Sequence, residues 1–354
     1  MAPTRIGITG ANGFIGAHLL RSAIGKGHRP IAFLQKGTPL QPIADLEGSY
    51  DPIYGDLLDL ETVDQFVSRC DVIFHLAGFN RYWSTDPTVF HKVNIEGVKN
   101  IAHACLKHKI QKLIHASSCI TLGASSKPIL RHEDSGYNLQ HLDFLYGETK
   151  TAGELEIKRF VRELGLPAVI INPTSAIGEK DYGPTPIGKP IGDIARGMWP
   201  VYVAGGACFI DVHDCVRGFW LALEHGKPGS QYVLVGENLS NQEFMTKVAV
   251  AAGLSQPRFK IPKLILHLVA YIGEWIANTF TKKHPPLTPG MVGLIGNYLY
   301  FDGSRAEKEL GFKAGPCGPA IERCVQWFRE TQWNNRPISL PAPVDSSAGI
   351  SRAD

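Results

Sequence analysis

Tyr146 and Lys150 stand four residues apart, on a segment that we predict to be helical. On an α-helix this spacing places both side chains on one face. A free tyrosine has a pKa of about 10 and transfers protons poorly at neutral pH. A neighbouring ammonium favours the phenolate, so Lys150 is predicted to lower the pKa of Tyr146. Such a pair suits proton exchange with an oxygen whose carbon gains or loses a hydride.

Three glycines near the N-terminus, Gly10, Gly13 and Gly16, form a second candidate site. They follow a predicted strand at residues 5–9 and open a predicted helix, which is the setting of a dinucleotide fingerprint. Backbone without side chains can approach a pyrophosphate closely, and a helix N-terminus offers free amides. Asn12 and Gly13 supply the tight turn. We therefore predict a dinucleotide site, although the spacing is Gly-x-x-Gly-x-x-Gly instead of Gly-x-Gly-x-x-Gly.

The end of the second predicted strand bears on the choice between NAD and NADP. NAD sites usually place an Asp or Glu there, which holds the ribose 2′-hydroxyl. This chain instead has Gln35 and Lys36, and the lysine would neutralise a 2′-phosphate. The sequence therefore favours NADP(H), with NAD as the alternative and a solvated surface role as the other interpretation of Lys36. Asp56, just after a short strand, is either a partner of the adenine amine or a turn residue.

Composition excludes several classes of protein. The chain has 354 residues, 44% of them hydrophobic, which allows a large core in one or two domains. Its 36 basic and 33 acidic residues are too balanced to imply a nucleic-acid partner. Seven cysteines without a Cys-x-x-Cys pair or zinc-like spacing predict a reduced, cytoplasmic protein with no metal site. No apolar run reaches the length of a membrane span, and the closest, residues 261–280, predicts a half-buried helix or peripheral membrane contact.

Alternating strands and helices in the first half predict an α/β fold with a doubly wound parallel sheet, the Rossmann arrangement. We expect a dinucleotide-binding core over residues 1–173. A smaller, mixed substrate-binding lobe is expected over 174–334, with segments returning to the core, and a disordered tail over 335–354. Within the lobe, residues 178–190 are predicted to form a mobile loop.

Individual elements follow from local signals. Asp59 is a predicted N-cap for a helix that ends near Arg69. The helix with the Tyr/Lys pair is predicted from Asp143 to Leu164, with Gly165 in a left-handed C-terminal position. The other predicted strands lie at 30–35, 71–76, 112–117 and 167–172, and the other predicted helices at 14–26 and 89–108.

Seven segments together resemble the extended short-chain dehydrogenase/reductase (NAD-dependent epimerase/dehydratase) family over roughly residues 4–330. They are Thr9–Gly16, Gly55–Leu57, His75–Ala77, Val93–Gly97, Ser117–Ser118, Tyr146–Lys150 and Asn172–Pro173. Residues 172–178, 209–214 and 232–239 are similar to the dihydroflavonol-reductase-like branch, which includes bacterial proteins called hopanoid-associated sugar epimerases. That branch usually has an arginine at the place of Gln35, so here recognition of a 2′-phosphate rests on Lys36.

The resemblance implies a role for each matching residue. Tyr146 is the general acid/base, and Lys150 lowers its pKa and holds the nicotinamide ribose. Ser118 donates to the substrate oxygen, with Ser117 as a weaker rival. Asn94 resembles the helix asparagine that supports the lysine through a water. The implied cofactor-binding residues are Gly10, Asn12, Gly13, Phe14, Ile15, Gly16, Gln35, Lys36, Asp56, Leu57, Leu76, Ala77, Gly78, Tyr146, Lys150 and Pro173.

The favoured function is an NADPH-dependent reductase of a ketone or aldehyde, in which a hydride reaches the carbonyl carbon and Tyr146 protonates the oxygen. One alternative is a nucleotide-sugar epimerase or dehydratase with retained NAD. Those enzymes usually carry Tyr-Gly-Pro after the equivalent of Asn172, where this chain has Ala176-Ile-Gly178-Glu. A steroid-type 3-hydroxy dehydrogenase and a non-catalytic NADP-binding sensor are further alternatives, and the sensor commonly lacks the Tyr/Lys pair.

The expected partner is a small carbonyl or alcohol substrate, and a homodimer is common in the family. The candidate substrate-pocket residues are Arg81, Tyr82, Trp83, Tyr182 and Trp199. Their aromatic rings either stack on a ring or sugar of the substrate or pack in the core of the lobe. His141 and Asp181 are either further pocket residues or ordinary loop residues.

Overall fold

The computed structural model describes residues 4–331 apart from 199, 283–284 and 286. The tail predicted over 335–354 and the candidate pocket residue Trp199 fall outside the described residues.

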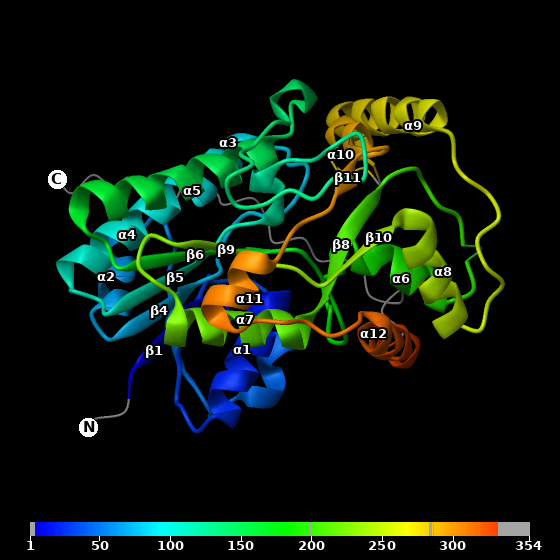
Figure 1. The fold of residues 1–354 in the computed structure, drawn as a ribbon. Helices are drawn as coiled ribbons and strands as arrows, with labels where there is room; N and C mark the ends of the chain where they lie inside the picture. The colour runs from blue at the N-terminus through cyan, green and yellow to red at the C-terminus, as the bar shows by residue number, and fades with distance from the viewer. Residues whose placement is uncertain (1–3, 199, 283–284, 286, 332–354) are drawn as a thin grey trace.

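A seven-stranded sheet forms the centre of the protein (Figure 1). All its strands are parallel, in the order β3-β2-β1-β4-β5-β6-β9. The strands are β1 (Ile6–Thr9), β2 (Ile31–Leu34), β3 (Asp51–Tyr54), β4 (Val72–His75), β5 (Lys112–Ala116), β6 (Ala168–Pro173) and β9 (Gln231–Leu234). The order reverses between β1 and β4, the place where such sheets open a crevice for a ligand. The predicted doubly wound α/β fold is confirmed.

Helices cover both faces of this sheet, and most residues of its strands are buried and apolar. One layer consists of α2 (Leu60–Val67), α3 (Thr88–His91), α4 (Gly97–Lys107) and α5 (Leu145–Leu164). The opposite layer consists of α1 (Phe14–Gly25), α7 (Val212–His225) and α11 (Ser304–Leu310). Two large hydrophobic clusters, one on each face, bind these layers to the strands.

Local signals in the sequence locate most of these elements. The carboxylate of Asp59 caps α2 by accepting the amides of Glu61 and Thr62, and Gly165 ends α5 with a φ of 68°, both as predicted. The predicted helix at 89–108 contains an unexpected π-helical turn, η2 (Lys92–Glu96), between α3 and α4.

The prediction of a loop over 178–190 is wrong at its C-terminal end, where α6 (Gly188–Ala195) begins. Asp181 organises this entry, because its buried carboxylate accepts the amide and the hydroxyl of Thr185, at 2.8 and 2.9 Å. The Thr185 hydroxyl in turn accepts the Gly188 amide at 2.9 Å. These hydrogen bonds organise the turn before α6. The Gly- and Pro-rich sequence contained no local signal for the start of this helix.

A smaller lobe lies beside the central sheet, on the right in Figure 1. Its sheet contains β7 (Ser175–Ile177), β8 (Gly206–Asp211), β10 (Glu237–Ser240) and β11 (Tyr298–Leu299). Its helices are α6, α8 (Asn241–Ala251), α9 (Lys263–Ile276), α10 (Pro289–Leu294) and α12 (Gly318–Glu330). The chain returns to the central layers with α7, β9 and α11, and the domain boundary at residue 173 stays a prediction. Among the described residues, no helix combines the length and apolar character needed to cross a bilayer.

Three histidines are buried in the central layers. His18 on α1 is 4% exposed, and His75 on β4 and His115 on β5 are 0% and 1% exposed. Burial disfavours the charged imidazolium, so it lowers the pKa of His18 to about 4 and that of His75 to about 3, and it holds the pKa of His115 well below 6.5. All three are therefore neutral near neutral pH.

We expect the free energy of unfolding to fall between pH 7 and pH 5. In this window the unfolded chain protonates these histidines at a pKa of about 6.5 while the folded protein does not, so stability is lost as the pH falls. The loss is on the order of 2 kcal/mol per histidine at pH 5. The raised pKa values of His213, Asp181 and Glu274 act in the opposite direction and offset part of it. Urea unfolding at both pH values measures the effect, and equal free energies would contradict the buried, neutral state.

Candidate active site

The glycine turn after β1 is shaped for close backbone approach. Gly10 has a φ of 68°, and a Cβ there would lie 2.7 Å from the amide nitrogen of Ala77, at the end of β4. A Cβ on Gly16 would collide with the Gly10 carbonyl oxygen. These glycines therefore let the turn pack tightly between α1 and the sheet edge.

The N-terminus of α1 is left free for an anion. Its N-cap, Gly13, is exposed and supplies no capping side chain, and the first turn, which includes Phe14, Ile15 and Gly16, has no acidic residue. The first amides of a helix lack intrahelical partners and carry a partial positive charge. This donor set fits the pyrophosphate of a dinucleotide.

The end of β2 places the residues predicted to contact the adenosine part. The Gln35 amide donates to the Asp56 carboxylate at 3.1 Å, and the Asn12 amide donates to the hydroxyl of Thr38 at 2.9 Å. Lys36 is exposed in the turn that follows. Leu57, in contrast, is only 7% exposed and packs in the core beneath α4, so only its backbone remains for a cofactor contact.

The end of β4 connects the glycine turn with Lys150. The Ala77 amide donates to the Thr9 hydroxyl at 3.1 Å, and that hydroxyl lies 2.7 Å from Nδ1 of His75. A Cβ on Gly78 would lie 3.7 Å from Nζ of Lys150. The segment Leu76-Ala77-Gly78 therefore runs between the predicted nucleotide site and the predicted catalytic lysine, while Pro173 ends β6 farther along the same edge.

Tyr146 and Ser118 meet at this edge. Burial raises the pKa of the half-buried Tyr146 to about 12, and its hydrogen bond with Ser118 acts in the opposite direction. Ser118 follows β5 and caps a short 3-10 helix, η3 (Cys119–Leu122), by accepting the Ile120 amide at 3.3 Å. Tyr146 is therefore a neutral phenol over the physiological range.

The prediction that Lys150 lowers the pKa of Tyr146 is wrong, because that pKa is raised in this structure. Nζ of Lys150 donates to the Ala116 carbonyl at 2.8 Å, and the loss of water around Tyr146 dominates its pKa. Burial also lowers the pKa of Lys150 to about 8, against the attraction of the Glu154 carboxylate, which raises it. The four-residue spacing correctly predicted that Tyr146 and Lys150 share a helix face. It could not predict that loss of water, and not charge, dominates the pKa of each side chain.

A buried carboxylate, Glu154, lies one helical turn beyond Lys150 and is 4% exposed. Although burial acts to raise its pKa, the Lys158 ammonium and several hydrogen bonds hold it below the usual range. Its donors are the hydroxyls of Ser117 (2.6 Å) and Thr121 (2.7 Å), the amides of Asn172 and Gln231 (both 2.9 Å), and Lys158 (2.8 Å). Sequence analysis missed this network, although Glu154 stands four residues after Lys150, the spacing that brings helix side chains together.

The network separates the two candidate serines. Ser117 donates to Glu154 and is 7% exposed, whereas Ser118 contacts Tyr146. The geometry therefore favours Ser118 for contact with a substrate oxygen.

Asn94 lies in the π-helical turn and supports the site indirectly. Its amide donates to the Phe79 carbonyl at 3.0 Å and to the Thr149 hydroxyl at 3.1 Å, and its side-chain oxygen accepts the Phe79 amide at 2.8 Å. A Cβ on Gly153 would collide with the Asn94 carbonyl oxygen. Asn94 thus joins the loop after β4 to α5.

The predicted pocket residues divide into two groups. The Tyr82 ring centroid lies 5.4 Å from that of Tyr146, and Arg81 and Trp83 are half-buried beside it in sequence. Tyr182 instead packs edge-on against Trp327 in the smaller lobe, at 5.2 Å. His141 is exposed on the short helix η4 (Gln140–Leu142), and Asp181 anchors the start of α6.

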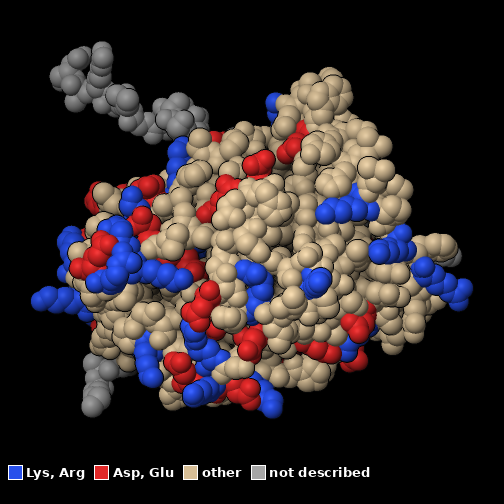
Figure 2. Space-filling view, turned by 45° about the horizontal axis from the view of Figure 1, so that its top comes forward, with Lys and Arg blue, Asp and Glu red and all other residues tan. Residues whose placement is uncertain are grey.

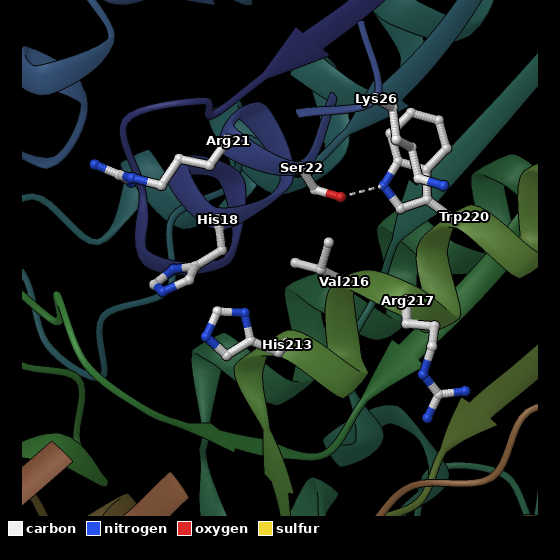
Figure 3. A pocket seen from close by; sticks show the side chains of 8 residues that line it. All are labelled: His18, Arg21, Ser22, Lys26, His213, Val216, Arg217 and Trp220. Carbon is white, nitrogen blue, oxygen red and sulfur yellow. Dashed lines mark hydrogen bonds between the residues drawn. The ribbon is translucent and has the colours of Figure 1, made fainter. Parts of the chain in front are cut away.

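A separate pocket of about 490 Å³ lies between α1 and α7 (Figure 3). It is lined by His18, Arg21, Ser22, Lys26, His213, Val216, Arg217 and Trp220, none of which is a predicted site residue. His18, His213 and Glu179 bring ligand-type atoms within 4.8 Å of one another. However, His213 and Glu179 already pair at 2.7 Å, and Arg323 donates to Glu179 at 3.0 Å, so the group is an ion-pair cluster.

Comparisons with known proteins place this geometry in context. The model of the NAD dependent epimerase/dehydratase family matches residues 6–235, which include all seven strands of the central sheet. The chain is 28% identical over 326 residues to a Synechocystis protein with the provisional name dihydroflavonol 4-reductase, covering 91% of this chain and 94% of that protein. It is 26% identical over 333 residues to sterol demethylase protein B of Methylococcus capsulatus, covering 91% and 98%. The solved structure of gox2253 is 33% identical, with a TM-score of 0.80, and the match covers 92% of this chain and 98% of that one.

We expect Lys150 to lose its proton near pH 8 in the free protein, because burial lowers its pKa. Amine labelling at a series of pH values, read by mass spectrometry, should show a midpoint near pH 8 for Lys150, below the roughly 10.4 of a free lysine side chain. Glu154→Gln removes the favourable negative charge and should move the midpoint lower, whereas Glu163→Gln, at the exposed end of the same helix, should not. A Lys150 midpoint equal to that of the exposed lysines would refute the assignment.

Proposed function

Because the chain belongs to the NAD-dependent epimerase/dehydratase family, we propose that it is an NAD(P)H-dependent reductase of a ketone or aldehyde. It is an enzyme of the extended short-chain dehydrogenase/reductase type. The observation that carries the proposal is the contact between the neutral phenol of Tyr146 and Ser118 at the edge where the glycine turn also lies.

The protonation states suit the reductive direction. When bound, the cofactor supplies the hydride. Tyr146 holds the proton that an alkoxide oxygen needs, since its pKa is raised to about 12. Ser118, which contacts Tyr146, donates to the same oxygen. Lys150, with a pKa of about 8, is mostly protonated near neutral pH and carries its positive charge one helical turn from Tyr146. A phenol that keeps its proton acts as an acid, which is the role required in carbonyl reduction.

We propose NADP(H) as the preferred cofactor. The end of β2 offers no carboxylate for a ribose 2′-hydroxyl, and the Asp56 carboxylate nearby is already paired with Gln35. Exposed Lys36 adds a positive charge to the same turn. These features fit a 2′-phosphate better than a free hydroxyl.

The second candidate is a nucleotide-sugar epimerase or dehydratase with retained NAD. The segment after Asn172 argues against it, because Ala176-Ile-Gly178-Glu replaces the Tyr-Gly-Pro usual in those enzymes. A steroid-type 3-hydroxy dehydrogenase is a variant of the first proposal. The name of the Methylococcus relative, a sterol demethylase protein, supports a sterol-type substrate, and Tyr82 and Phe144 pack around Tyr146. The homodimer and the cytoplasmic location stay predictions.

Tyr146→Phe should abolish carbonyl reduction and leave nucleotide binding nearly intact, because it removes only the transferable proton. Turnover is followed by NADPH consumption over a carbonyl panel, and binding by fluorescence titration. Turnover that survives this substitution would remove Tyr146 from the chemistry.

Neighbouring serines provide a matched pair for the same assay. Ser118→Ala should lower kcat by roughly 10²–10³, as expected for one lost donor to a developing oxyanion. Ser117→Ala should leave kcat close to that of the original protein but lower Tm, because it deprives the buried Glu154 of a donor. The reverse pattern would reassign the serine.

Lys36→Ala should weaken NADPH binding more than NADH binding, since only NADPH carries the 2′-phosphate. An exposed ion pair of this kind contributes about 1 kcal/mol, or about fivefold in Kd. Lys308→Ala, on the exposed face of α11, is the matched control and should change neither affinity. Equal losses for both nucleotides would exclude the phosphate role of Lys36.

A further inference from the structure

Exposed apolar side chains concentrate on α9 and the π-helical turn that follows it. Residues 264–280 contribute nine of the 19 exposed large hydrophobic side chains found in the described chain. They are Leu264 (80% exposed), Ile265, Leu268, Val269, Tyr271, Ile272, Trp275, Ile276 and Phe280 (68%). Isolated exposed hydrophobic residues are normal, but a contiguous patch of this kind marks an interaction surface.

The attachment of α9 to the protein is narrow. Leu266 and Ala270 are buried and pack against Val292 of α10. With 3.6 residues per turn, Leu264, Leu268, Tyr271 and Trp275 fall on the opposite side of the helix. The exposed apolar side therefore has no partner within the described chain.

The border of this surface is basic. Arg258, Lys260, Lys263 and Lys282 are all exposed around α9, and between residues 258 and 282 the sequence has one acidic residue, Glu274. Burial raises the pKa of that carboxyl. Figure 2 shows this upper right part of the molecule as largely uncharged surface that carries a few Lys and Arg side chains.

We propose that α9 docks on the surface of a membrane that contains anionic phospholipids. An amphipathic helix with an aromatic, aliphatic side and lysines at its border lies in the plane of the lipid headgroups. Helix α9 continues directly into a π-helical turn, η5 (Ala277–Thr281), which carries Phe280. No helix among the described residues is long and apolar enough to span a bilayer. A second copy of this chain fits less well, because a two-fold contact through α9 would bring its basic borders together.

The docking helix lies close to the predicted chemistry. On one side α10 packs under α9 through Val292. On its other side Gly290 lies against Phe144, and Leu294 joins the cluster that contains Phe144 and Tyr146. One short helix thus separates the membrane-facing surface from Tyr146. Resting on the proposed reductase function, this arrangement indicates a carbonyl substrate that partitions into lipid.

Vesicle flotation with the full chain tests the docking directly and needs no turnover. The protein should float with vesicles of phosphatidylcholine containing phosphatidylglycerol, less with phosphatidylcholine alone, and less at high salt. The double variant Leu268→Glu/Trp275→Glu should bind roughly tenfold or more weakly, because it places two charges in the apolar contact. The matched control is Leu60→Glu/Leu155→Glu, at similarly exposed positions on α2 and α5, and it should bind as the original protein does.

Three results would overturn the proposal. The first is no flotation with anionic vesicles, and the second is equal flotation of both double variants. The third is a dimer in light scattering that only Leu268→Glu/Trp275→Glu dissociates, because this would assign α9 to contact with a second copy of the chain. Failure of the reductase proposal appears separately, as flotation without NADPH consumption on any carbonyl. The substrate inference is tested with matched short-chain and long-chain ketones, and it requires vesicles to stimulate reduction of the long-chain ketone alone.

Discussion

The buried carboxylate of Glu154 is the contact on which the candidate site depends. A buried charge is stable only when fully paired, and Glu154 has five donors, which come from α5, the segment after β5, β6 and β9. This arrangement ties α5 to the carboxyl ends of β5 and β6 and to the first residue of β9. Tyr146 and Lys150, which stand two turns and one turn earlier on the same face of α5, are thereby held over that edge.

The glycine turn approaches the same edge of the sheet from α1 and β1. Gly10 packs against the end of β4, and the segment from Leu76 to Gly78 continues from there toward Lys150. The order of the sheet places β1 and β4 side by side, so the first amides of α1 and the Tyr146–Lys150 face of α5 lie at the same carboxyl edge of the sheet. Hydride transfer requires this proximity between cofactor and proton donor.

Features that depend on a few neighbouring residues follow from the sequence. They are the Asp59 cap, the Gly165 terminus and the helix that carries Tyr146 and Lys150. Features that depend on tertiary burial do not follow from the sequence. The raised pKa of Tyr146 and the donors of Glu154 come from segments far apart in the chain, and the π-helical turn at Asn94 accompanies close packing against Gly153. For residues 261–280 the sequence predicted a half-buried helix or peripheral membrane contact. The structure adds which side of α9 is exposed, because α10 packs against Leu266 and Ala270 only.

The most direct test of the account is transfer of deuterium from NADPH labelled at the nicotinamide C4. Incubation with a carbonyl panel should yield an alcohol that carries one deuterium, formed by the original protein and not by Tyr146→Phe. Deuterated product from Tyr146→Phe at an undiminished rate would contradict the assigned proton donor. Tightly held NAD, together with interconversion of nucleotide sugars and no net consumption of NADPH, would contradict the proposal that the protein is a reductase.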